Sequence, residues 1–319
     1  MVPFLPRFLT SLLILLSPVL VQAQDSAVGT SSDSVEERQV DIYSEGVRMA
    51  GTVFMPAESA EERLPTILMA HGWGGTAAGL RRDAIAFARN GYLVVTFDYR
   101  GWGESDARIM LSEPQQADTP NGRFTAEVRE IREIVDPVDM TTDWLNALHW
   151  LHGEPRVDPE RIGLWGTSQS GGYVVWAAAQ DPRVRAVHSQ VGSFDGRALG
   201  TSAEAYQQAT LRARGELGYP EPGERVVGNL RGAPILSRFA HHAPVDDIRA
   251  IEGVAIQIVL AENEELFDNR DNGILAHARY QGGLKNLVII PNISHYGIYQ
   301  EAREEAQQLA LDWFDAHLK

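Results

Sequence analysis

The run from Arg161 to Gly172 (R-I-G-L-W-G-T-S-Q-S-G-G) constrains the fold of this chain more than any other feature. A short β-prone segment leads into a cluster of small residues, and an apolar run of helical length follows from Tyr173. The pattern predicts a strand, a tight turn with Ser168 at its apex, and a helix, which together push a hydroxyl out of a sheet edge. Small residues suit this turn, because it is strained and the two backbones pass close together.

The turn departs from the pattern G-x-S-x-G at one position. Gly166 lies two residues before Ser168, but Ser170 stands two residues after it, where glycine is usual. Ser170 is therefore a second candidate for the apex, although it would have Ser168 where the turn requires glycine. A phosphate-binding loop is an alternative interpretation, but the lysine of a P-loop and the spacing G-x-G-x-x-G are both missing from this run.

Composition fits one large folded domain. A chain of 319 residues with 44% hydrophobic and 22% charged residues can bury a full core. The net charge of −15 argues against nucleic acid as a partner, because a phosphate backbone requires clustered Lys and Arg. The absence of cysteine excludes a thiol nucleophile and disulfides.

The first residues have the pattern of an export signal. The apolar run from Phe8 to Val21 ends in the small-x-small sequence Val21-Gln22-Ala23, so residues 1–23 predict a signal peptide cut after Ala23. The run is shorter than the roughly 20 residues of a bilayer span, and we expect no stable membrane insertion after cleavage; an uncleaved anchor is the alternative. The protein is then exported, either periplasmic or secreted. Residues 24–37, rich in Ser, Asp and Glu, predict a disordered leader.

Residues 38–319 alternate between strand-length apolar runs and helical segments, which predicts an α/β fold with a mostly parallel central sheet and helices on both faces. A hairpin comes first, around Glu45-Gly46. The remaining predicted strands are Thr66–Ala70, Leu93–Phe97, the run before Ser168, Val184–Val191, Val254–Leu260 and Leu287–Ile290. The predicted helices are Leu80–Asn90, Asp136–Leu151, the run from Tyr173, about Ala203–Gly215, and about Ile298–His317. Residues from about 193 to 250 interrupt this alternation and predict a small cap insertion over the strand ends, or else a purely structural excursion.

Five polar residues follow predicted strand ends, where ligand sites of such sheets form. They are His71, Asp98, Ser168, Glu264 and His295. A serine needs an adjacent base to act as a nucleophile, and His295 is the best placed of nine histidines, because it lies in a loop between the last strand and the last helix. The other histidines considered fall on helices, in a strand or in the cap: His149, His152, His188, His241, His242, His277 and His317.

A carboxylate must orient the imidazole and stabilise its cation. The run A-E-N-E-E-L-F-D after the strand Val254–Leu260 offers several acids. Glu264 is preferred, because it lies a few residues past the strand end where the chain should turn over the sheet. The acids left open are Glu262, Glu265, Asp268, Asp271 and Asp195.

A developing oxyanion needs two fixed amide donors. We expect them to be the backbone N–H of Gln169, directly after the nucleophile, and that of Trp73 in the loop H-G-W-G-G. Three aromatic residues near strand ends are candidates for a substrate pocket, with ordinary packing as the alternative: Tyr99, Trp102 and Tyr296.

The chain resembles α/β-hydrolase fold serine hydrolases, near the dienelactone-hydrolase-like and acyl-peptidase-like esterases, over roughly residues 38–318. The resemblance rests on H-G-W-G-G, on D-Y-R-G-W-G-E-S from Asp98, on the turn at Ser168, on A-E-N-E and on His295. The family order of nucleophile, acid and base corresponds to Ser168, Glu264 and His295. Ser170 in place of glycine and glutamate in place of the commoner aspartate are departures. The resemblance implies no metal and no organic cofactor.

The leading functional hypothesis is hydrolysis of a small-molecule ester, or of a related thioester or activated acyl bond, through an acyl-enzyme on Ser168. Two alternatives remain open at this point. One is an exported serine peptidase of the same fold, and the other is a non-catalytic binding protein that keeps the hydrolase fold.

Overall fold

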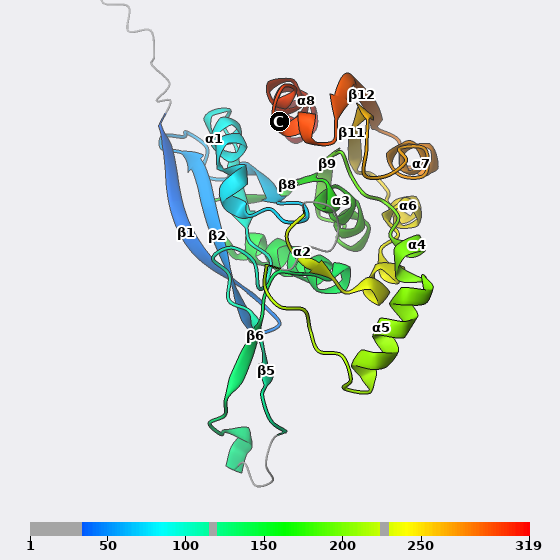
Figure 1. Cartoon of the computed structure of the whole chain (residues 1–319). Coiled ribbons are helices and arrows are strands. Elements are labelled where there is room, and N and C mark those ends of the chain that lie inside the picture. Colours follow the sequence, from blue (N-terminus) through cyan, green and yellow to red (C-terminus); the bar gives the residue numbers. More distant parts are fainter. Residues whose placement is uncertain (1–33, 115–119, 224–229) are drawn as a thin grey trace, which may run out of the picture. The chain divides into compact units, whose positions relative to one another are not determined.

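The computed structural model describes residues 34–114, 120–223 and 230–319. Its main sheet has eight strands, which run in the spatial order β1-β2-β4-β3-β8-β9-β11-β12 (Figure 1). Their bounds are β1 Val35–Ser44, β2 Val47–Pro56, β3 Leu64–Ala70, β4 Leu93–Phe97, β8 Val157–Thr167, β9 Val184–Gln190, β11 Ala255–Asn263 and β12 Lys285–Ser294. β1 and β2 pair antiparallel, as do β2 and β4, and every other pairing in this sheet is parallel. The predicted mostly parallel sheet is confirmed.

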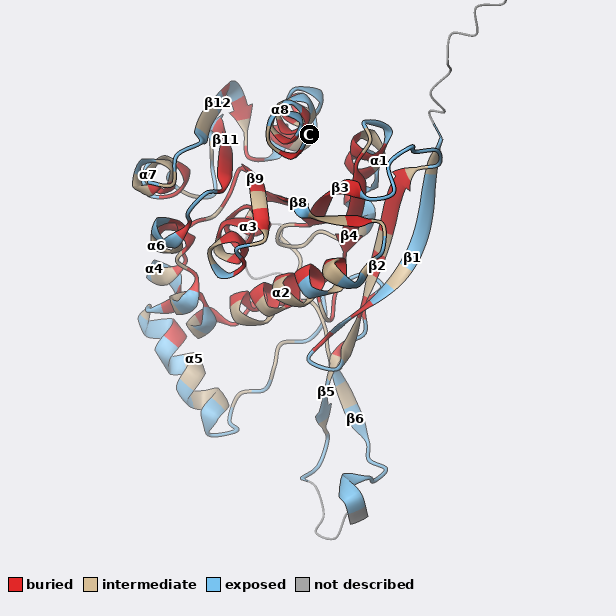
Figure 2. Ribbon diagram, turned by 180° about the vertical axis from the view of Figure 1, so that it is seen from behind, coloured by how far each residue is buried: buried red, intermediate tan, exposed pale blue. Residues whose placement is uncertain are grey.

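Helices cover both faces of the sheet because the buried strands alternate their side chains. In β3, Ile67 and Met69 belong to the apolar cluster beneath one pair of helices, whereas Leu68 and Ala70 belong to the cluster on the opposite face. The first face carries α1 Arg81–Arg89 and α8 Arg303–Leu318. The opposite face carries α2 Pro137–Gly153, α3 Gln169–Gln180 and α7 Gly273–Arg279. Figure 2 shows the central strands of the sheet and the inward sides of these helices as the buried part of the molecule, whereas the edge strand β1 is largely exposed.

The order of the strands determines where a site can form. From β3 the chain moves outward to β4, then returns to place β8 on the other side of β3. Such a reversal leaves a crevice at the carboxyl ends of the two central strands. Ala70 pairs with Gly166 at those ends, so the loop that begins at His71 lies beside the turn at Ser168. The adjacent pair of Thr167 with Gln190 continues the same edge.

Smaller elements follow the sheet strands in two places. After β4 a two-stranded arm forms, which projects from the body in Figure 1. It consists of β5 Arg108–Leu111 and β6 Val128–Ile131, with η2 Pro120–Gly122 between them. After β9 come α4 Arg197–Gly200, α5 Ala203–Ala213, η3 Leu236–His241, α6 Pro244–Asp247, η4 Ile248–Ala250 and β10 Ala233–Pro234, which pairs with β7 Ile134–Val135. The remaining short helices are η1 Ala77–Leu80 and η5 Tyr296–Tyr299.

The sequence predictions need three corrections or additions. The predicted leader ends too late, because residues 35–37 already pair with β2 as the start of β1. The β5–β6 arm was not predicted, since its strands are only four residues long and largely exposed. The predicted last helix is divided into η5 and α8.

The predicted signal peptide and most of the leader lie outside the described residues. Among the residues that are described, no helix is long and apolar enough to cross a membrane.

Candidate active site

Ser168 occupies the turn between β8 and α3 in a strained backbone conformation, with φ 54° and ψ −124°. A non-glycine residue at such angles costs free energy and is held only by its surroundings. Its N–H donates to the carbonyl of Gln190 at 3.0 Å. The neighbouring backbone comes very close: a Cβ at Gly72 would lie 2.7 Å from the Cβ of Ser168, and a Cβ at Gly166 would overlap the carbonyl oxygen of Ser170. The predicted requirement for small residues around this turn is confirmed.

His295 follows β12 and brings its ring to the serine. Its Nε2 lies 3.0 Å from the Oγ of Ser168. The side chain is only 2% exposed, so the ring is largely withdrawn from solvent. Phe267 and Tyr296 pack edge-on against this ring, with centroids at 5.8 and 5.4 Å. These contacts hold the imidazole in the plane that reaches the hydroxyl.

Glu264 is the acid that contacts the His295 ring. Its two carboxylate oxygens lie 2.8 and 3.0 Å from Nδ1. Its side chain is 2% exposed, and the N–H of Leu266 donates to it at 3.0 Å, which fixes the carboxylate. With Nδ1–H donated to Glu264, Nε2 is left as the acceptor for the hydroxyl proton of Ser168.

The other acids that the sequence left open have different partners. Glu265 also contacts His295, but through the backbone: its carboxylate accepts the His295 N–H at 2.7 Å. Glu262 accepts from the N–H of Asn292 at 2.8 Å. Asp268 and Asp195 form ion pairs with arginines two residues further along the chain, and Asp271 is exposed in a loop. Of these acids, only Glu264 contacts the imidazole ring.

The two predicted amide donors lie on either side of Ser168. Gln169 is the first residue of α3, where an N–H has no acceptor within the helix. Trp73 lies in the loop after β3, and no backbone acceptor for its N–H is found among the described residues. The indole of Trp73 donates to the carbonyl of Gly232 at 3.0 Å and packs against Phe239, so the segment before and within η3 holds this loop in place.

Two of the three aromatic residues predicted to line a substrate pocket are buried instead. Tyr99 is fully buried, and Trp102 is 1% exposed with its indole donating to the carbonyl of Ile134 at 3.0 Å. Both rings therefore pack beneath the loops and cannot line an open pocket. Tyr296 is 38% exposed beside His295, so it alone keeps the position expected of a substrate contact.

A second histidine and carboxylate also meet at this edge of the sheet. His71 and Asp98 directly follow β3 and β4, and Nε2 of His71 lies 3.6 Å from the nearer oxygen of Asp98. Nδ1 of His71 lies 2.9 Å from the carbonyl of Gly72. Burial lowers the pKa of His71, against the opposing effect of Asp98. All five predicted strand-end residues lie at this edge, but only three of them form a contiguous chain of contacts.

Two residues near the nucleophile were not singled out by the sequence. The hydroxyl of Tyr299, in η5, lies 2.6 Å from Oγ1 of Thr167, and burial raises the pKa of Tyr299 above its ordinary value. His242, which the sequence placed in the cap, is buried against α3, with Nε2 3.1 Å from the side-chain nitrogen of Gln169. Burial lowers the pKa of His242 to about 4, so this ring is neutral near pH 7. No sequence motif marks either residue, because their partners Thr167 and Gln169 are distant in the sequence.

The described residues contain no group of three or more His, Cys, Asp or Glu arranged to hold a metal ion.

Comparison with known proteins gives a family and several relatives. The model of the X-Pro dipeptidyl-peptidase (S15) family matches residues 45–212. An Escherichia coli protein, called an uncharacterized 31.7 kDa protein in the traX-finO intergenic region, is 28% identical over 80% of this chain and 91% of its own length. The quorum-quenching protein AidA of Acinetobacter baumannii is 30% identical over 53% of this chain and 49% of its own. The thiohydrolase aneE of Aspergillus aculeatus is 32% identical over 46% and 38%.

Solved structures share the fold across nearly the whole chain. Hypothetical protein PA2218 from Pseudomonas aeruginosa superposes with a TM-score of 0.68 at 21% identity, covering 95% of this chain and 100% of that one. The α/β hydrolase GrgF from a Penicillium species gives 0.68 at 19% identity, covering 89% and 99%. A putative dienelactone hydrolase from Klebsiella pneumoniae gives 0.56 at 14% identity, covering 88% and 99%. The predicted α/β-hydrolase fold is confirmed.

Proposed function

We propose that this chain, which belongs to the X-Pro dipeptidyl-peptidase (S15) family of α/β hydrolases, is a serine hydrolase that cleaves a carboxylic ester or thioester through an acyl-enzyme on Ser168. One observation carries the proposal. The imidazole of His295 lies within hydrogen-bond distance of Ser168 on one side and Glu264 on the other, at 3.0 and 2.8 Å. This is the arrangement that activates a serine hydroxyl.

The first half of the reaction forms the acyl-enzyme. Oγ of Ser168 attacks the substrate carbonyl while its proton moves to Nε2 of His295, and Glu264 stabilises the resulting imidazolium. The carbonyl oxygen takes up the negative charge, which the N–H groups of Trp73 and Gln169 would bind. When the carbonyl re-forms, the bond to the alcohol or thiol breaks, and His295 returns its proton to that leaving group.

The second half releases the acid. A water molecule gives a proton to Nε2 of His295 and attacks the acyl carbonyl. The same two amides bind the oxyanion, and collapse of the tetrahedral intermediate breaks the bond to Oγ of Ser168. His295 then returns the proton to Ser168, so the enzyme is restored with one water consumed.

A small acyl compound is the substrate class we propose. A relative called a thiohydrolase supports hydrolysis of an acyl bond to sulfur, although it matches only about half of this chain. Tyr296 and Phe267 flank the His295 ring and offer apolar surface to an acyl group or an alcohol. A cavity of about 580 Å³ borders the acid loop, but its lining includes neither Ser168 nor His295, so we do not assign the substrate to it.

A peptidase activity is the second candidate, because the matching family is described as an X-Pro dipeptidyl-peptidase family. Amides have poorer leaving groups than esters, so the two activities separate on matched substrates. We expect acyl p-nitrophenyl esters to be hydrolysed much faster than the corresponding p-nitroanilides, dipeptidyl X-Pro anilides included. Faster turnover of an X-Pro anilide would replace the esterase proposal with the peptidase one.

The direct test uses purified protein and Ser168→Ala. A panel of p-nitrophenyl esters and acyl thioesters of graded acyl length should be hydrolysed by the wild type, and the variant should lose activity by several orders of magnitude. Ser112→Ala, a substitution at the end of the β5–β6 arm, serves as a control for purification and folding. Equal activity of wild type and Ser168→Ala would exclude the acyl-enzyme on Ser168. A folded wild type that hydrolyses nothing and binds no active-site phosphonate would favour a binding protein instead.

We also propose that the N-terminal segment directs export and that residues from about 193 to 250 act as a cap. Mass determination of protein recovered from a culture medium or periplasmic fraction should give a chain that begins at Gln24. A full-length chain confined to the cytoplasm would contradict export. Shortening α5 should change the preference for acyl length, whereas an unaltered preference would leave the segment with a structural role only.

A further inference from the structure

Ser170 is the residue at which the turn at Ser168 departs from the usual pattern G-x-S-x-G, and it is fully buried beside the loop after β3. Oγ of Ser170 donates to the carbonyl oxygen of His71 at 2.6 Å. His71 is the last residue before Gly72 and Trp73, so this bond joins the first turn of α3 to the loop after β3. Glycine at this position would leave the carbonyl without that donor.

This bond is the last in a buried series of hydrogen bonds, and the donor and acceptor of each bond in the series can be assigned. The indole N–H of Trp144 can only donate, and it donates to the hydroxyl of Tyr99 at 2.8 Å. The Tyr99 hydroxyl in turn contacts Oγ of Ser170. Because Ser170 gives its own proton to His71, it accepts the proton of Tyr99. Burial raises the pKa of Tyr99 above its ordinary value, so the phenol keeps that proton over the working pH range.

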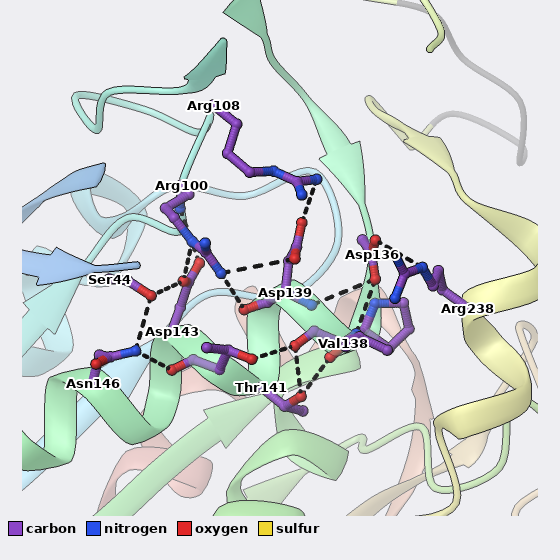
Figure 3. A network of polar contacts seen from close by, with 12 residues as sticks. Ser44, Arg100, Arg108, Asp136, Val138, Asp139, Thr141, Asp143, Asn146 and Arg238 are labelled. Carbon is purple, nitrogen blue, oxygen red and sulfur yellow. Dashed lines mark hydrogen bonds and ion pairs between the residues drawn. The ribbon is translucent and has the colours of Figure 1, made fainter. Parts of the chain in front are cut away.

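The Trp144 end of this series of hydrogen bonds is anchored by a polar network on α2. Trp144 lies on α2 next to Asp143, whose carboxylate forms a buried ion pair with Arg100 at 2.5 Å. The same carboxylate accepts from Ser44 at 2.6 Å, and Asn146 donates to that serine at 3.1 Å (Figure 3). This network holds the segment containing Tyr99 on α2. The series of hydrogen bonds from Trp144 to the carbonyl of His71 therefore begins on a helix that this network holds in place.

We infer that Ser170 is a positioning residue that sets the spacing between the two halves of the oxyanion hole. One half is the N–H of Gln169, the residue before Ser170. The other half is the N–H of Trp73, two residues after the carbonyl that Ser170 binds. Amide donors act on an oxyanion only at hydrogen-bond distance, and a displacement of about 1 Å can cost up to about 10²-fold in rate. The inference rests on the proposed function, since the spacing matters only if an oxyanion forms there.

Two substitutions remove the hydroxyl without touching Ser168, His295 or Glu264. Ser170→Ala is close to isosteric, and Ser170→Gly restores the usual residue of the motif and guards against misfolding of the alanine variant. For both we expect kcat on an ester substrate to fall about tenfold, with KM within about twofold of wild type, because the lost bond acts on the transition state. Binding of a trifluoromethyl ketone, which forms an oxyanion on the serine, should weaken by the same factor.

Ser189→Ala is the matched control. Ser189 is also fully buried, and its hydroxyl also donates to a backbone carbonyl, that of Gly171 on the same helix, at 2.8 Å. Among the described residues, its hydroxyl forms no hydrogen bond to the loop after β3. We expect the control to lose thermal stability much as Ser170→Ala does, while its kcat and its affinity for the ketone stay within about twofold of wild type. Tyr99→Phe, which keeps the bond from Ser170 to His71, should likewise lower stability more than kcat.

The combined results decide between positioning and structural roles. A tenfold loss of kcat and ketone affinity in both Ser170 variants, absent from Ser189→Ala, supports the inference. Wild-type kcat in either folded Ser170 variant, or an equal loss in Ser189→Ala, would overturn it while leaving the proposed function standing. A wild type that neither hydrolyses esters nor binds the ketone would overturn both.

Discussion

Two histidine–carboxylate pairs lie at the same edge of the sheet and differ in what each partner is free to do. His295 and Glu264 follow the ends of β12 and β11, whereas His71 and Asp98 follow the ends of β3 and β4. All four side chains are at most 5% exposed. By residue type and position, the two pairs are equivalent candidates for acid–base chemistry.

Their hydrogen bonds separate them. The Glu264 carboxylate places both oxygens within 3.0 Å of Nδ1 of His295, whose other nitrogen faces Ser168. The Asp98 carboxylate instead accepts from the N–H groups of Ala77 and Glu104, at 2.7 and 3.1 Å. Nε2 of His71 is buried and has no hydrogen-bond partner among the described residues. One pair is thus poised for proton transfer, and the other clamps two loops together.

The largest expected difference is in the loss of kcat when each of the two histidines, His295 and His71, is replaced. His295→Gln should lower kcat by roughly 10⁴–10⁶-fold, since the base of a triad accounts for losses of that order. His71→Gln should lower it by at most about tenfold, through disturbance of the oxyanion loop. Ester hydrolysis by both purified variants, with thermal unfolding as the check on folding, measures the gap. A loss of comparable size in a folded His71→Gln protein would make the two pairs functionally equivalent.

The next largest difference is between the two carboxylates, since replacing Glu264 should affect kcat and replacing Asp98 should affect stability. Glu264→Gln removes the charge that stabilises the imidazolium and should lower kcat by about 10⁴-fold with little loss of stability. Asp98→Asn should keep kcat within about threefold of wild type and instead lower the free energy of unfolding by about 1–3 kcal/mol, because an N–H group loses its acceptor. Kinetics and urea unfolding on the same samples test both halves. The reverse assignment of effects would exchange the roles of the two acids.

A smaller effect distinguishes Glu264 from its neighbour. Glu265 holds only the backbone N–H of His295 and is exposed at the surface. Glu265→Ala should lower kcat by about three- to tenfold, because the loop that carries His295 loses one anchor. Glu265→Gln keeps an acceptor oxygen and should behave like the wild type. A loss in Glu265→Gln as large as that in Glu264→Gln would transfer the role of the acid to Glu265.

The last expected difference concerns the pH dependence of stability. Burial lowers the pKa of His71, and it lowers the pKa of the equally buried His188 to about 4. The unfolded chain binds a proton at each such histidine below about pH 6.5 while the native chain does not, so each lowers stability as the pH falls from 6.5 towards 4. The stability advantage of wild type over His188→Gln should shrink by about 2 kcal/mol between pH 7 and pH 4.5. Carboxylates common to both proteins cancel in this difference, which urea unfolding at pH 7 and pH 4.5 would measure; a constant difference would mean that His188 is protonated in the native state.

The two pairs also show which site residues could be predicted from the sequence and which could not. Position after a strand end located Ser168, Glu264 and His295, because the carboxyl ends of parallel strands lie at one edge. The same rule included His71 and Asp98, since it cannot tell which backbone groups a carboxylate will bind. Those partners belong to distant loops, and no spacing in the sequence encodes them.

The direction in which a side chain points was the second property that the sequence could not predict. Tyr99 and Trp102 lie beyond a strand end as predicted, but both are buried beneath the loops, and the sequence pattern does not show which way a side chain in an irregular turn points. Glu264 and Glu265 are adjacent in sequence, yet one contacts the imidazole and the other the backbone of the same residue. Ser170 was noted as a departure from a motif and as a second candidate for the apex of the turn, whereas its bond to His71 depends on how closely two loops approach.

The most direct test is to locate the acyl group. Mixing the protein with a p-nitrophenyl ester, quenching with acid within the first turnovers and mapping the peptides by mass spectrometry should place the added acyl mass on Ser168. In His295→Gln the modified peptide should be absent on the same timescale. An acyl group on Ser170 or on any other residue, or rapid turnover by wild type with no modified peptide under conditions where the acyl-enzyme accumulates, would contradict the account.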